Sequence, residues 1–130
     1  MTPEREEGAS APRLLLVDDN QDALAVTQTA LTLDGYSVVT AESVRDALDV
    51  LDLQPIDVVV SDVRMPGVDG FDFLRVLRHR FPALPVILAT GTPITESDAV
   101  PRGARVLRKP FKLEDLRDAI AEQLASRRPS

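Results

Sequence analysis

The chain has 130 residues, a length that suits one domain, and its formal net charge of −6 argues against a nucleic-acid partner, because such binding needs a basic surface. It has no cysteine and one histidine, which excludes disulfide frameworks, thiolate metal sites and thiolate nucleophiles and disfavours a general hydrolase. No apolar run approaches the roughly 20 residues that cross a bilayer, and residues 1–12 lack the apolar segment of a signal peptide, so we expect a cytoplasmic protein without membrane contact.

Short apolar runs alternate along the chain with segments of helical periodicity. In chain order we predict a loose polar tail at 1–12, a strand at 14–17, a helix at 21–34, a strand at 37–41, a helix around 44–51, a strand at 56–61, a helix at 71–81, a strand at 85–89, a strand at 105–108, a helix around 113–124 and a short tail at 128–130. This alternation is typical of βαβ units, which build a doubly wound parallel sheet with helices on both faces.

Local signals support several of these boundaries. Gly35 is the residue type that best adopts the left-handed conformation at a helix end, and it closes the first predicted helix. Ser43 followed by Asp46 has the form of a helix N-cap with an acidic third position. Between residues 92 and 103, Pro93 and Pro101 leave room for one or two helical turns at most, so we predict a short or absent fourth helix.

Polar side chains follow four of the five predicted strands. They are Asp18, Asp19, Asp62, Thr90 and Lys109. Because the carboxyl ends of parallel strands share one edge of the sheet, we expect these side chains to converge there. Three converging carboxylates repel one another unless a cation joins them, and oxygen ligands suit Mg²⁺. A metal-bound aspartate facing a phosphate donor is a possible nucleophile, with Lys109 and Thr90 addressing the phosphoryl oxygens.

Four motifs then point to a family. They are Leu15-Leu16-Val17-Asp18-Asp19-Asn20, residues 61–70 (SDVRMPGVDG), Ala89-Thr90-Gly91 and Lys109-Pro110-Phe111. In this order they resemble the motifs of bacterial two-component response-regulator receiver domains, over residues 13–127. The resemblance implies a stand-alone, chemotaxis-regulator-like receiver with a flavodoxin-like five-stranded parallel sheet of order 2-1-3-4-5.

The resemblance also implies a role for each matching residue. Asp62 would be the phosphoacceptor and would bind Mg²⁺ together with Asp19 and the main-chain carbonyl of Arg64, while Asp18 would act through a bound water. Thr90 would bond to the phosphoryl group and Lys109 would pair with it. The Lys109–Pro110 bond would be cis, as the small cis penalty before proline permits. Arg64 and Thr92 would modulate the access of water to the phosphoryl group.

Two features depart from the family pattern. Val106 stands where most receivers have a Tyr or Phe that turns inward on activation, so this switch position has no ring to move. Thr90 and Lys109 lie closer in sequence than in members with a full fourth helix. The chain thus resembles atypical receivers with an Ala-Thr-Gly motif and a remodelled fourth-helix region.

The favoured hypothesis is a phosphorylation switch rather than an enzyme with its own substrate. A histidine kinase or histidine phosphotransfer protein would phosphorylate Asp62, and the altered domain would change its affinity for a downstream protein. The alternatives are a phosphorelay intermediate or phosphate sink, the N-terminal receiver of a longer transcription factor or signalling protein, and a pseudo-receiver that is never phosphorylated. On simpler readings Asp18 and Asp19 only cap a helix, and His79 is an exposed surface residue.

Overall fold

A five-stranded parallel sheet forms the centre of the molecule. The computed structural model describes residues 11–62, 64–65, 68–91 and 104–126. The strands are β1 (Arg13–Val17), β2 (Ser37–Ala41), β3 (Val58–Asp62), β6 (Val86–Thr90) and β7 (Ala104–Arg108). Their order across the sheet is β2-β1-β3-β6-β7, and every neighbouring pair is parallel. Because β6 and β7 are the fourth and fifth strands of this sheet in chain order, the predicted order 2-1-3-4-5 of a doubly wound sheet is confirmed.

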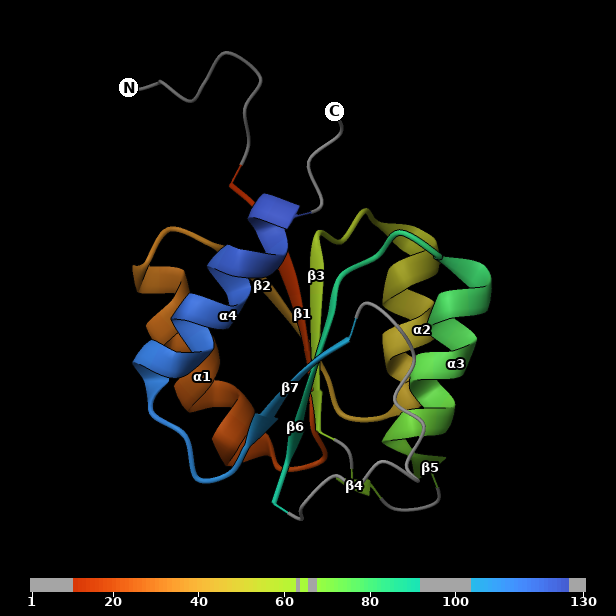
Figure 1. Cartoon of the computed structure of the whole chain (residues 1–130), viewed down its shortest axis with the longest axis horizontal. Coiled ribbons are helices and arrows are strands. Elements are labelled where there is room, and N and C mark those ends of the chain that lie inside the picture. Colours follow the sequence, from red (N-terminus) through yellow and green to blue (C-terminus); the bar gives the residue numbers. More distant parts are fainter. Residues whose placement is uncertain (1–10, 63, 66–67, 92–103, 127–130) are drawn as a thin grey trace.

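Helices cover both faces of this sheet. The described residues contain α1 (Gln21–Leu33), α2 (Val44–Leu53), α3 (Gly70–Arg80) and α4 (Leu113–Ser126). As Figure 1 shows, α1 and α4 lie on one face and α2 and α3 on the other. Among the described residues, none of the helices combines the length and the apolar character that a membrane crossing needs.

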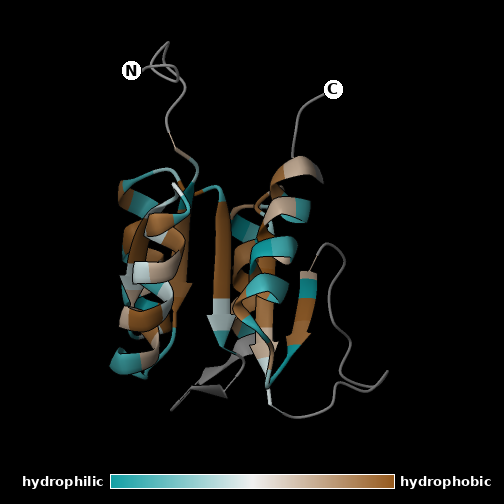
Figure 2. Ribbon diagram, turned by 90° about the vertical axis from the view of Figure 1, so that its left-hand side faces the viewer, coloured by the Kyte–Doolittle hydropathy of each residue, from teal (hydrophilic) through white to brown (hydrophobic). Residues whose placement is uncertain are grey.

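The sheet separates two apolar cores, because successive side chains of a strand point to opposite faces. Leu14 and Leu16 of β1 pack against α1 and α4, whereas Leu15 and Val17 pack against α2 and α3. All four are buried. Figure 2 shows the consequence in colour, with hydrophobic strands between helices that carry both hydrophilic and hydrophobic residues. An aliphatic core of this kind agrees with the low aromatic content.

The helix boundaries follow local side-chain chemistry. Gly35 has a φ of 101°, the left-handed conformation that was predicted at the end of the first helix. The hydroxyl of Ser43 accepts a hydrogen bond from the backbone N–H of Asp46 at 3.1 Å, which confirms the predicted N-cap of α2. The side chain of Asn20 caps α1 in the same way, by accepting from the backbone N–H of Ala23 at 3.0 Å. These caps fix the residues at which each helix leaves the sheet edge.

Some boundaries differ from the prediction. The loop expected after Asp62 contains a small antiparallel ribbon, β4 (Arg64–Met65) with β5 (Val68–Asp69), at the carboxyl end of the sheet. Two-residue strands are too short to show an alternating pattern in the sequence. β3 begins at Val58 rather than at residue 56. Just before it, the N–H of Asp57 donates to the carbonyl of Arg13 at 2.7 Å, and the Asp57 side chain accepts from the N–H of Arg13 at 2.7 Å.

Three predicted features lie outside the described residues. They are the N-terminal tail up to residue 10, the shortened helix predicted between 92 and 103, and the tail at 128–130. Of the tail at 1–12, the described part includes Pro12, whose carbonyl accepts a hydrogen bond from the N–H of Ser37 at 3.0 Å.

Candidate functional site

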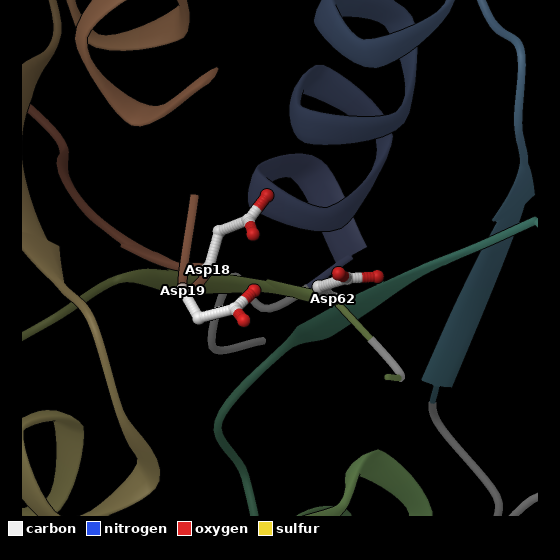
Figure 3. Close-up of side chains that lie close together, drawn as sticks. All are labelled: Asp18, Asp19 and Asp62. Atoms are coloured by element: carbon white, nitrogen blue, oxygen red, sulfur yellow. The ribbon is translucent and has the colours of Figure 1, made fainter. Parts of the chain in front are cut away.

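Three carboxylates meet at the carboxyl ends of the two central strands. Asp18 and Asp19 directly follow β1, and Asp62 is the last residue of β3. Because Val17 and Ser61 are partners in the register of these strands, the two chain segments leave the sheet side by side. One carboxylate oxygen from each aspartate lies within 4.8 Å of the others. Figure 3 shows the three side chains gathered at this edge, as the sequence predicted.

Lys109 brings a positive charge to the same place. Its ammonium Nζ lies 3.2 Å from Oδ1 of Asp62. The Asp62 side chain is 14% exposed and that of Lys109 is 41% exposed, so the cation reaches in from the solvent side. The backbone N–H of Lys109 donates to the carbonyl of Thr90 at 2.7 Å, and the Lys109–Pro110 bond is cis as the resemblance implied. The backbone of Lys109 is therefore held at the ends of β6 and β7, and its side chain extends from there to Asp62.

Asp18 is held by two backbone groups. Its own N–H donates to the carbonyl of Ala41 at 3.1 Å, and its Oδ1 accepts from the N–H of Asn20 at 3.0 Å. Burial raises the pKa of the Asp18 carboxyl above its ordinary value, and the negative charges of Asp62 and Asp19 raise it further. The hydrogen bond from Asn20 and the charge of Lys109 act in the opposite direction. Without a bound cation, the ionised form of the Asp18 carboxyl is thus less stable than that of an isolated aspartate.

Thr90 and Arg64 lie in strands that end near the cluster, and Thr92 lies outside the described residues. Thr90 is fully buried at the end of β6, in register with Arg108. Arg64 lies in β4, directly beyond Asp62, where its partner is Asp69. The structure therefore brings Asp18, Asp19, Asp62 and Lys109 together and places Thr90 at the neighbouring strand end.

Val106, at the predicted switch position, lies in the middle of β7. It is half-buried and packs against the core on the side of α2 and α3, in register with Leu88. A valine side chain has no polar end and only one rotatable bond that moves its heavy atoms. Val106 therefore has no ring that could make the inward and outward movement predicted for an aromatic residue at this position.

A cavity of about 160 Å³ opens beside the carboxylates, between α1 and α4. Asp18, Asp62 and Lys109 line its polar end, and apolar residues such as Leu24 and Leu116 line the rest. The side chain of Asp62 therefore borders a small cavity as well as the carboxylate cluster.

The carboxylate cluster fits a hard divalent cation. Three acidic side chains face one lysine ammonium at this edge, so negative charge is in excess among the described residues. Carboxylate oxygens are the ligands that Mg²⁺ takes in proteins, and it usually keeps several waters beside one or two of them. Asp18, Asp19 and Asp62 can each offer one carboxylate oxygen to such an ion.

The role of Asn20 at this site was not predicted. Asn20 belongs to the first motif, and its backbone N–H holds the side chain of Asp18. The signal that could have revealed it is the tendency of an Asp side chain to accept a hydrogen bond from the backbone N–H two residues further on.

Comparison with known proteins agrees with this fold. The sequence model of the response regulator receiver domain matches residues 14–121. The response regulator protein FleR of Pseudomonas aeruginosa is 36% identical over 122 residues, which cover 92% of this chain and 26% of FleR. The chain belongs to the response regulator receiver domain family, and so is a domain of two-component signal transduction.

Solved structures lead to the same family. A CheY-like receiver domain protein from Methanospirillum hungatei has a TM-score of 0.84 at 26% identity, with 91% of this chain and 97% of that chain covered. The response regulator TrrA of Thermotoga maritima, solved in complex with Mg(2+)-BeF, has a TM-score of 0.79 at 27% identity, with 87% and 99% covered.

The chain spans about a quarter of the length of the curated relatives that match it first, which include a transcriptional regulatory protein of Escherichia coli.

Proposed function

We propose that Asp62 accepts a phosphoryl group in a reaction that depends on Mg²⁺. The observation that carries this proposal is the cluster of Asp18, Asp19 and Asp62, with the ammonium of Lys109 3.2 Å from Asp62 Oδ1. Asp19, Asp62 and the main-chain carbonyl of Arg64 would hold the ion, and Asp18 would hold one of its waters. The complex of TrrA with Mg(2+)-BeF supports this assignment by similarity.

The chemistry would be a direct displacement at phosphorus. A carboxylate oxygen of Asp62 forms the new bond to phosphorus, and the bond from phosphorus to the donor nitrogen or oxygen breaks, leaving its electron pair on the donor. Bound Mg²⁺ would neutralise charge on the phosphoryl oxygens. Lys109 would exchange its contact with Asp62 for one with the phosphoryl group, and the Thr90 hydroxyl would donate to another oxygen. Hydrolysis would later transfer the group to water, with Arg64 and Thr92 modulating the access of that water.

The donor that we propose is a phosphohistidine of a histidine kinase or of a histidine phosphotransfer protein. The output would be a changed affinity for a downstream protein, which requires that the phosphorylated and unphosphorylated forms differ at the binding surface. Relatives of this chain are transcriptional regulators, two of them named as DNA-binding, which favours a second candidate, the receiver of a longer regulator. Direct nucleic-acid binding by the domain is not part of the proposal, and the cytoplasmic location stays a prediction.

Intact-mass measurement after incubation with acetyl phosphate tests the acceptor. We expect the parent protein to gain one phosphoryl group in the presence of Mg²⁺ and much less with a chelator. Asp62→Ala should gain none, whereas Asp49→Ala, which removes an exposed aspartate of α2, should behave as the parent. A parent protein that gains no mass, or an Asp62→Ala variant that still does, would refute the assignment.

A phosphotransfer assay separates a switch from a relay. Purified kinase, this protein and a histidine phosphotransfer protein are mixed, and the phosphoryl group is followed on each. Rapid passage through Asp62 to a second histidine identifies a relay intermediate, whereas retention on Asp62 identifies a switch.

A further inference from the structure

Asn20 connects the carboxylate cluster to the first turn of α1 through two separate hydrogen bonds. Its backbone N–H donates to Oδ1 of Asp18 at 3.0 Å. Its side-chain oxygen accepts from the backbone N–H of Ala23 at 3.0 Å. One residue thus contacts a proposed partner of the metal and the helix at the same time.

The helix end of this connection is firmly anchored. The carbonyl of Asn20 accepts the first helical hydrogen bond from Leu24, at 3.1 Å. Leu24 and Leu31 are 6% and 0% exposed, so the inner face of α1 is fixed against the sheet. Because the side chain and the carbonyl of Asn20 are both bound to this helix, the cap restrains the backbone torsions of Asn20 and, through them, the direction of its N–H.

The other end of the connection fixes the orientation of a carboxylate. A single bond from Cβ would let the Asp18 carboxylate rotate, but the amide of residue 20 holds Oδ1 and so sets the plane of the group. The N–H of Asp18 is itself held by Ala41 of β2. The second oxygen of Asp18 therefore has a defined direction relative to Asp19 and Asp62.

We propose that Asn20 is a positioning residue for the magnesium site, acting through the N-cap of α1 on the carboxylate of Asp18. This inference rests on the proposed function, since it assigns a role toward the ion that Asp18 would bind through water. Groups that orient metal ligands commonly contribute on the order of tenfold or more to metal affinity. The competing interpretation is that Asn20 is an ordinary helix cap.

The chain supplies a matched control for that interpretation. Ser43 caps α2 with the same geometry, its hydroxyl accepting from the N–H of Asp46 at 3.1 Å, and it is not part of the carboxylate cluster. Asn20→Ala and Ser43→Ala each remove one cap and should lower the unfolding temperature to a comparable degree. Asn20→Ser keeps a capping oxygen and should restore the parent behaviour. Asn20→Gly lacks the oxygen but destabilises helix caps little, which guards against a variant that fails to fold.

The experiment is a Mg²⁺ titration of the full chain by calorimetry. A second measurement records how far Mg²⁺ raises the unfolding temperature of each variant. We expect Asn20→Ala and Asn20→Gly to raise the dissociation constant on the order of tenfold, with Asn20→Ser and Ser43→Ala close to the parent. Equal Mg²⁺ affinity in Asn20→Ala and Ser43→Ala would overturn the inference and leave a helix cap only. If the parent itself binds no Mg²⁺, the proposed function is overturned first, so the two failures are distinguishable.

Discussion

The ammonium of Lys109 lies 3.2 Å from Oδ1 of Asp62. Lys109 directly follows β7, Asp62 is the last residue of β3, and the two are 47 positions apart in the sequence. Lys109 supplies the positive charge that the described residues place in direct contact with the cluster. Its exposure of 41% means that solvent screens part of this interaction, so its value to stability is modest. Its position is nonetheless what a phosphoryl group on Asp62 would require.

Replacing Lys109 should therefore matter most without metal. We expect Lys109→Gln to lower the free energy of unfolding by about 1 kcal/mol or less in the presence of a chelator, because the carboxylates lose a counter-charge. Saturating Mg²⁺ should remove most of the difference. Thermal unfolding with and without Mg²⁺ measures both, and Lys112→Gln, an exposed lysine three residues on, is the control. A loss that is the same in both conditions would contradict the explanation.

The raised pKa of Asp18 predicts a pH dependence of stability with a definite sign. A carboxyl whose pKa is higher in the folded than in the unfolded state binds more protons when folded, so its contribution is complete below the unfolded pKa. That contribution is lost as pH rises through the folded pKa. Asp18→Asn should thus unfold at a higher temperature than the parent at pH 7 in a chelator, with the gap closing below about pH 4. Paired melting curves across this range test it, and a pH-independent gap would be the contrary result.

Magnesium should stabilise the folded protein, since the three carboxylates come together only there. At ten times the dissociation constant the expected gain is about 1.4 kcal/mol. Asp19→Asn should abolish most of this gain. Asp22→Asn, which removes a nearby acidic residue of the first turn of α1 outside the cluster, should retain it. Equal responses of the two variants to Mg²⁺ would argue against a role of Asp19 as ligand.

Two leucines of α1 offer a test of the packing. Leu31 is fully buried in the core on the side of α1 and α4, whereas Leu33 is 82% exposed. We expect Leu31→Ala to reduce the free energy of unfolding by about 2–5 kcal/mol, and Leu33→Ala to change it by about 0.5 kcal/mol or less. Chemical denaturation of both variants gives the comparison. Similar losses at the two positions would mean that α1 packs differently from the arrangement described.

Much of the fold was predictable because each local signal is strong. The apolar run at Val58-Val59-Val60 reads as a strand covered on both faces, and it is fully enclosed in the structure. Gly35 and Ser43 marked helix ends through their own conformational and capping chemistry. The location of the site followed from a topological rule, since Asp18 and Asp62 end neighbouring parallel strands.

What could not be predicted depends on distances between residues remote in sequence, or on segments too short for a pattern. The ribbon of Arg64–Met65 with Val68–Asp69 has two residues in each strand. The contact of Lys109 with one oxygen of Asp62 requires coordinates. The opposing influences on Asp18, burial against the amide of Asn20, likewise depend on how deeply the side chain lies.

The division of the interior into two cores has a consequence for sequence change in the central strands. Alternate residues of β1 pack on opposite faces of the sheet. Inserting or deleting a single residue would therefore turn leucines that pack against α1 and α4 toward α2 and α3, and the reverse. The same shift of register in β3 would also turn the carboxylate of Asp62 away from Asp18 and Asp19. Variation in chain length should therefore occur in the loops at the amino ends of the strands, opposite the carboxylate cluster. The stretch from Val58 to Asp62 should keep a constant length.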